Sequence, residues 1–174
     1  KEIYTQDGVV DEAFPPLPVT VTLEDEIDLG RGDMITHLHN ITDVDNTLEA
    51  MIVWMSEEAM AVPGNYYFKH LHNLVGGDIV SLRYRINVNT LHREDAEALE
   101  LNQIGRAVII LNRPIPYDPY TRNKATGSFI IIDRITNNTV GAGIILDRSP
   151  GELVGTPDRL EERPPDEIKT VSSA

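Results

Sequence analysis

The 174-residue chain contains no cysteine. It therefore has no disulfide framework, no thiolate metal site and no cysteine nucleophile, which is typical of a reducing compartment such as the cytoplasm. Basic residues are also scarce, because 15 Lys and Arg stand against 28 Asp and Glu and give a net charge of -13. Such a chain repels phosphate backbones and anionic lipids, so we expect neither nucleic acid nor a membrane as its partner.

Long apolar runs and helical patterns are missing as well. The apolar runs reach four to six residues, too few to cross a bilayer. Only Asp95–Leu101 could form a turn of helix, and its length makes that helix marginal. Apolar residues nevertheless make up 41% of the chain, which is enough for a core. We expect a folded protein built from strands.

Short β-branched segments alternate with Gly, Pro, Asn and Asp along most of the sequence, and this pattern predicts an all-β protein. Val19–Leu23 alternates apolar and hydroxyl side chains, as a strand does when one of its faces is buried. Six segments after residue 46 suffice to close a small barrel: Leu48–Met55, Tyr66–Leu71, Asp78–Val88, Gly105–Leu111, Ser128–Ile132 and Val140–Leu146.

Changes in composition predict three parts. The segment Asn40–Asn46 is rich in Asn and Asp and marks the boundary between a first unit and the six-strand unit. From Ser149 to Ala174 proline and charge alternate, which is typical of a tail or linker. We therefore predict divisions at residues 1–42, 43–147 and 148–174.

Two His-x-His pairs are the most suggestive chemical groups, His37 with His39 and His70 with His72. On a strand, both imidazoles of such a pair point to one face at metal-ligand distance, and two pairs could form a four-nitrogen site. The pairs would have to meet in space and would need carboxylates to orient them. Surface histidines on two unrelated strands are the alternative that we favour.

Other short motifs fit turns and strands better than chemistry. Arg31-Gly32-Asp33 resembles an adhesion tripeptide but predicts a turn, and Asp25, Glu26 and Asp28 predict a solvated acidic turn rather than a general acid and base. Gly141-Ala142-Gly143 lacks the Lys-Ser/Thr pair of a phosphate loop and indicates a close backbone approach or a bulge.

A glycosylation triplet and the single tryptophan also have structural interpretations. Asn137-Asn138-Thr139 is a formal glycosylation triplet without a secretory signal, and Trp54 is expected to anchor a core or an interface. None of these motifs by itself identifies a chemical reaction. We predict no catalytic, cofactor-binding or metal-binding residue in this chain.

Seven blocks of the sequence form a pattern when they are read together: Leu23–Asp28, Arg31–Met34, Met51–Met55, Val88–Leu91, Leu101–Arg106, Thr126–Arg134 and Asn138–Gly143. In their order and spacing they resemble the GTPase large subunit of bacterial sulfate adenylyltransferase, the CysN/NodQ family. The resemblance covers residues 1–146, and the block Phe129–Gly143 also resembles the third domain of translation elongation factors.

The resemblance implies both an architecture and an activity. Members of the family carry a P-loop GTPase domain followed by two β-barrels, and they pair with a small subunit that converts ATP and sulfate into adenosine 5′-phosphosulfate and diphosphate. GTP hydrolysis drives this reaction. Residues 1–42 would be the last strands of the middle barrel, and residues 43–147 a six-stranded antiparallel Greek-key barrel like domain III of elongation factors.

We therefore expect a non-catalytic, cytoplasmic C-terminal fragment of this enzyme. The P-loop is not in the sequence, so GTP and Mg²⁺ would belong to the N-terminal domain and this fragment would bind no GTP. Its expected partners are the catalytic small subunit and its own GTPase domain. The alternatives are a small metal-binding barrel that uses the His-x-His pairs and an elongation-factor-like RNA-binding module, which the negative charge disfavours.

Two structural expectations follow. Strand alternation predicts that six apolar side chains share inward or interdomain faces of the barrel: Val53, Met55, Ile109, Leu111, Ile130 and Ile132. A first unit that begins midway through a barrel leaves the Val19–Leu23 strand with an open edge. We predict that residues 1–36 fold back on the barrel or pair with a second copy, which allows a homo-oligomer.

Overall fold

The computed structural model describes residues 2–36, 39 and 41–146, so the predicted tail from 148 to 174 lies outside the described residues. Every regular element within these residues is a β-strand, which confirms the all-β prediction, and the candidate helix at Asp95–Leu101 is irregular. The chain divides into two compact units at Asp33/Met34. None of the described residues forms a helix with the length and apolar character of a membrane crossing.

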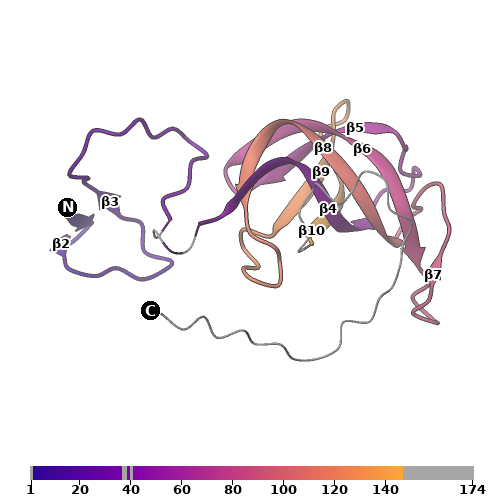
Figure 1. Cartoon of the computed structure of the whole chain (residues 1–174), viewed down its shortest axis with the longest axis horizontal. Coiled ribbons are helices and arrows are strands. Elements are labelled where there is room, and N and C mark those ends of the chain that lie inside the picture. Colours follow the sequence, from indigo (N-terminus) through magenta and orange to yellow (C-terminus); the bar gives the residue numbers. More distant parts are fainter. Residues whose placement is uncertain (1, 37–38, 40, 147–174) are drawn as a thin grey trace, which may run out of the picture. The chain divides into compact units, whose positions relative to one another are not determined.

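Six strands of the second unit close into an antiparallel barrel (Figure 1). Their order around the barrel is β5-β9-β10-β4-β8-β6, and pairing of β6 with β5 closes the circle. The short strand β7 (Arg93–Glu94) pairs with the far end of β6. The barrel strands are β4 (Asp43–Trp54), β5 (Gly64–His70), β6 (Asn73–Ile86), β8 (Ile104–Tyr117), β9 (Ser128–Asp133) and β10 (Thr139–Ile145).

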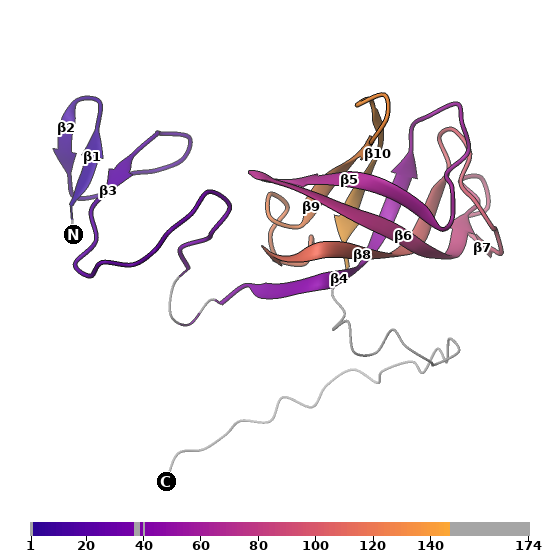
Figure 2. The ribbon, with the colours of Figure 1, turned by 90° about the horizontal axis from the view of Figure 1, so that it is seen from above.

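The connectivity is that of a Greek key. β5 pairs with β6 and β6 with β8, each antiparallel, and β9 then returns to lie on the other side of β5. Figure 2 shows β5 and β6 side by side, with β7 at the end of β6. The six-stranded antiparallel Greek-key barrel is therefore confirmed.

The interior of the barrel is apolar and closely packed. Ile52, Ile79 and Ile131 from three different strands are fully buried. Trp54 meets the edge of Tyr66 at a centroid distance of 5.6 Å and donates its indole N–H to the Glu58 carbonyl oxygen at 2.7 Å. This indole is a core anchor, as the sequence predicted, because its polar atom is satisfied while its rings are buried.

Of the two predicted options, the inward face is confirmed in β8 and is wrong in two other strands, where an interdomain face stays a prediction. Ile109 and Leu111 are buried as expected. Val53 of β4 and the two expected residues of β9, Ile130 and Ile132, point outward and are half-buried, and Met55 is 52% exposed. Both faces of β4 and β9 carry apolar side chains here, so a period of two cannot identify the inner face.

The first unit is a three-stranded sheet in the order β2-β1-β3, built from β1 (Ile3–Thr5), β2 (Gly8–Val10) and β3 (Thr20–Val21). Val19, Val21 and Leu23 are all exposed, so the expectation of one buried face was wrong: within this unit no layer covers the described residues of the sheet. β3 pairs with β1 on one side and forms an edge of the described sheet on the other. Folding back or strand exchange by residues 1–36 stays a prediction.

Candidate interaction surfaces of the barrel

The second His-x-His pair does not present two imidazoles on one face. His70 is the last residue of β5 and its side chain points into the barrel, whereas His72 is exposed in the following turn. Leu71 between them has a φ of 49°, which breaks the strand alternation. Of the first pair, His37 lies outside the described residues, as do Leu38 and Asn40 on either side of His39. Within the described part of the chain, no group of three or more His, Asp or Glu is placed to hold a metal ion.

The imidazole of His70 is instead built into the core. The residue is 1% exposed, and its Nε2 donates to the Thr126 carbonyl oxygen at 2.7 Å, while the buried Nδ1 has no hydrogen-bond partner in the described part of the chain. Burial lowers the pKa of His70, and the bond to Thr126 only partly opposes this effect. Thr126 Oγ1 donates in turn to Asp118 Oδ2 at 2.8 Å, so this histidine fixes the loop between β8 and β9.

The remaining sequence motifs are structural. Asp25, Glu26 and Asp28 are exposed, as a solvated acidic turn requires, and Arg31-Gly32-Asp33 forms a turn in which Asp33 N–H donates to the Gly30 carbonyl oxygen at 3.2 Å. Asn137 of the glycosylation triplet has a φ of 59° in the turn between β9 and β10. These observations favour the turn interpretations of the sequence.

Gly141-Ala142-Gly143 lies inside β10, where the register shifts between Thr139 and Gly141 and a Cβ atom on Gly141 would lie 3.0 Å from the Val53 carbonyl oxygen, so the prediction is confirmed at Gly141. A Cβ atom on Gly143 would come within 2.3 Å of the Phe129 ring. The glycine therefore makes room for the aromatic pair of Phe129 and Phe68, whose centroids are 5.9 Å apart.

An open apolar groove runs across the outside of β4, β9 and β10. It has a volume of about 710 Å³. The outward residues of the three strands line it: Met51, Val53, Ser128, Ile130, Ala142 and Ile144. They lie side by side because Ile144 pairs with Met51, and Ala142 pairs with Val53 on one side and Ile130 on the other. Contiguous apolar surface on the outside of a barrel is typical of a face that packs against protein.

Two lysines and a tyrosine border this groove. Lys69 lies on β5 next to Ile130, whereas Tyr120 and Lys124 come from the loop that follows β8. The two ammonium groups make this border basic within a chain of net charge -13. An apolar groove with a cationic border favours an apolar partner surface that carries carboxylates.

A buried ion pair lies on the outer side of β4 and β8. Glu49 Oε1 is 2.6 Å from Arg106 Nε, and the two side chains are only 3% and 11% exposed. Burial lowers the pKa of Arg106, but the side chains of Glu49 and Tyr84 together outweigh it and raise the pKa. Glu49 Oε2 has no hydrogen-bond partner among the described residues. The pair fixes the β4–β8 register and offers no exposed reactive group.

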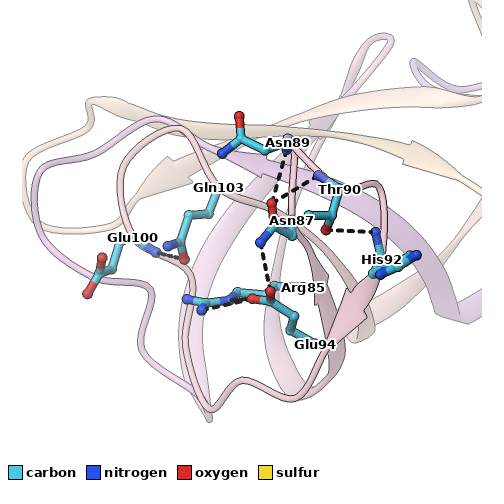
Figure 3. A network of polar contacts seen from close by, with 8 residues as sticks. All are labelled: Arg85, Asn87, Asn89, Thr90, His92, Glu94, Glu100 and Gln103. Carbon is cyan, nitrogen blue, oxygen red and sulfur yellow. Dashed lines mark hydrogen bonds and ion pairs between the residues drawn. The ribbon is translucent and has the colours of Figure 1, made fainter.

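A second surface is formed by the loop that joins β6 to β7 together with β7 itself, residues 87–94, which we term the docking loop. Its centre is Asn87, whose Oδ1 accepts the backbone N–H groups of Asn89 and Thr90 while its Nδ2 donates to Glu94 Oε1 at 2.7 Å (Figure 3). Arg85 binds the other oxygen of Glu94 through Nε and Nη2, each at 3.0 Å. The hydrogen bonds from Asn87 and Arg85 lower the pKa of Glu94.

Backbone bonds and a ring contact close the same loop. Leu91 N–H donates to the Asn87 carbonyl oxygen at 2.7 Å, and Asn87 N–H donates to the His92 carbonyl oxygen at 2.9 Å. The guanidinium of Arg93 lies 4.7 Å from the centre of the Tyr84 ring. A loop closed by these contacts therefore presents Val88 and Leu91 to solvent, with exposed fractions of 59% and 77%.

Sequence reasoning placed Val53 and Ile130 on inward or interdomain faces but described neither surface as a whole. The signal for the groove was present in Met51–Met55 and Phe129–Ile132, which are apolar on both faces of a strand. The loop lies in the block Val88–Leu91, which supported the resemblance to a family but indicated no contact. Neither pattern shows which strands become neighbours, and the groove depends on that.

Comparisons with known proteins agree with the barrel and with the resemblance. The family described as GTP-eEF1A C-terminal domain-like matches residues 47–146. The chain is 53% identical over 140 residues to a bifunctional enzyme CysN/CysC of Rhodopirellula baltica and 47% identical over 139 residues to sulfate adenylyltransferase subunit 1 of Bacteroides fragilis. The predicted resemblance to the CysN family is confirmed.

These relatives are much longer than the chain. Each alignment covers 80% of this chain, but only 22% of the Rhodopirellula protein and 29% of the Bacteroides protein. A crystal structure of Sup35 complexed with GMPPNP shares the fold with a TM-score of 0.70 and 14% identity, over 83% of this chain and 36% of that one. The chain thus spans about a quarter of the length of the curated relatives that it matches.

Proposed function

The chain belongs to the GTP-eEF1A C-terminal domain-like family, and on that premise we propose that it is the non-catalytic barrel part of a sulfate adenylyltransferase subunit 1. The parent enzyme would use GTP hydrolysis to drive the reaction of ATP with sulfate to adenosine 5′-phosphosulfate and diphosphate. The 47% identity to the subunit 1 relative, over 139 residues and 80% of this chain, carries this proposal.

The two surfaces of the barrel support a role in assembly. The groove offers apolar side chains from three strands, and the docking loop offers two more on a rigid frame. Surfaces of this kind bind protein, since apolar contact area at the centre of an interface provides most of the affinity. The barrel would act as a rigid body between the GTPase domain and the catalytic subunit.

The proposed parent enzyme determines where nucleotides and sulfate would bind and where the chain would act. GTP and Mg²⁺ would be bound by the GTPase domain, and ATP and sulfate by the catalytic subunit. This chain would contribute no catalytic residue and would act in the cytoplasm, without nucleic acid or membrane. The His-x-His metal alternative is not favoured, because His70 and His72 point to different environments.

Isothermal titration calorimetry of the purified chain with its cognate catalytic subunit tests this proposal. We expect saturable binding with a dissociation constant on the order of micromolar, about 8 kcal/mol. An unrelated acidic protein of similar size is the control and should give no heat beyond dilution. Absence of binding at concentrations about a hundredfold higher would contradict the proposal.

A further inference from the structure

Leu91 occupies a position that folding of this chain does not explain. Its φ of 59° lies in the left-handed region, which glycine and asparagine adopt with less strain than leucine. Its side chain is also 77% exposed, so strain is not offset by burial. Asparagine at this position would relieve the strain and remove apolar surface from water. A leucine here is unfavourable for the isolated chain on both counts.

Two other apolar residues, each in a turn, lack this combination of a left-handed backbone and a mostly exposed side chain. Ile135 is 90% exposed, but its backbone has no positive φ, and a single exposed apolar residue is ordinary. Leu71 has a φ of 49°, but it lines the groove and is only 37% exposed. Leu91 alone of these three combines left-handed backbone with a side chain that is mostly in water.

The docking loop is also closed by contacts within the chain itself. Asn87, Glu94 and Arg85 form a connected network beneath its tip, and Arg93 stacks on Tyr84 beside it. A loop that is already ordered loses little conformational entropy on binding. Its two apolar residues, three positions apart on one closed turn, are therefore suited to act as a preformed anchor.

We propose that the docking loop binds the catalytic subunit of sulfate adenylyltransferase by inserting Leu91 into an apolar pocket of that subunit. The inference rests on the proposed function, and it is supported by the name of the Bacteroides relative, subunit 1, which requires at least one further subunit. His92 and Arg93 follow Leu91 directly, so carboxylates at the rim of the pocket would complement the loop. Val88 adds apolar contact on the same turn.

The substitution Leu91→Asn separates this role from a structural one. We expect the variant of the full chain to bind the catalytic subunit at least about tenfold more weakly in calorimetry, because a buried anchor is lost. Its melting temperature should stay the same or rise, because asparagine tolerates the left-handed backbone. The control Ile135→Asn removes a comparably exposed apolar side chain from another turn and should leave the affinity unchanged.

Each outcome decides between the two proposals. If the unsubstituted chain binds and Leu91→Asn binds equally well, the docking loop is not the contact and the proposed function stands. If Leu91→Asn lowers the melting temperature by several degrees, Leu91 serves the fold and the inference fails. If the unsubstituted chain does not bind at all, the proposed function fails and the inference fails with it.

Discussion

The clearest residue-level consequence of the fold concerns His70. Its Nε2–H reaches the Thr126 carbonyl oxygen, and its buried Nδ1 finds no partner among residues 2–36, 39 and 41–146. Protonation would place a second N–H group where these residues offer no acceptor, in a site that already disfavours charge. The neutral imidazole is therefore the form that the folded barrel accepts.

This arrangement predicts a pH dependence of stability. The pKa of His70 is lowered in the folded state relative to about 6.5 in the unfolded chain, so the unfolded state binds more protons as the pH falls. The free energy of unfolding should be highest above about pH 6.5 and should decrease from there towards pH 5. Carboxylates titrate near pH 4 and contribute only at lower pH.

The variant His70→Gln isolates this contribution, because its amide can keep the bond to Thr126 but does not titrate. We expect it to be about 1–2 kcal/mol less stable than the unsubstituted chain at pH 8 and nearly equal at pH 5 in urea unfolding. His72→Gln, in the exposed turn, is the control and should leave the pH profile intact. Parallel profiles for the two variants would show that His70 does not titrate on unfolding.

The same residue shows what a His-x-His pattern cannot predict. A shared metal-binding face requires strand geometry through all three residues, but β5 ends at His70 and Leu71 takes the left-handed turn to β6. The position of that turn depends on the pairing of His70 with Asn73. Nothing in the three residues themselves specifies it.

Among the elements, β8 and β4 show where alternation predicts register. Ile109 and Leu111 flank the outward Ile110, and the expectation for β8 was right. The run Met51–Met55, at the end of β4 and just beyond it, is apolar at every position, and Trp54 decides which face is inside. A buried indole excludes Val53 and Met55 from the core, so the aromatic residue was the better guide.

β6 shows a different obstacle. The strand begins at Asn73, five residues before the predicted start at Asp78. The prediction missed its first residues because Gly76 and Gly77 lie among them. Glycines weaken a strand pattern in the sequence, but here Gly77 allows the neighbouring strand β8 to approach closely. A Cβ atom on Gly77 would lie 2.6 Å from the Ile110 carbonyl oxygen. Such contacts are properties of the sheet and cannot be derived from one strand.

The substitution Gly143→Ala tests the packing of β10 against β9. The added methyl would overlap the Phe129 ring, so we expect a loss of about 1–3 kcal/mol in the free energy of unfolding. Ala142→Ser, one residue away on the groove side, should change it by less than about 0.5 kcal/mol. Adding Phe129→Leu to Gly143→Ala should recover part of the loss, because the two sites share one space. Strictly additive losses would contradict this packing.

For the whole molecule, the sequence predicted the class, the number of barrel strands and their Greek-key order. The last of these came from the resemblance to a family, not from alternation. The groove could not be predicted from the sequence, because it forms only when β4, β9 and β10 are neighbours. The docking loop could not be predicted either, because it depends on the pairing of Arg85 with Glu94 across β6 and β7. Interaction surfaces of this kind arise from the assembled barrel.

The central claim is that this chain is the barrel part of a sulfate adenylyltransferase subunit 1. Its most direct test is a chimera in which residues 1–146 replace the matching segment of the Bacteroides fragilis relative, purified with that organism's catalytic subunit. We expect GTP-stimulated synthesis of adenosine 5′-phosphosulfate within about tenfold of the parent enzyme, a difference of about 1.4 kcal/mol in activation free energy. A folded chimera that hydrolyses GTP but no longer stimulates this synthesis would contradict the account.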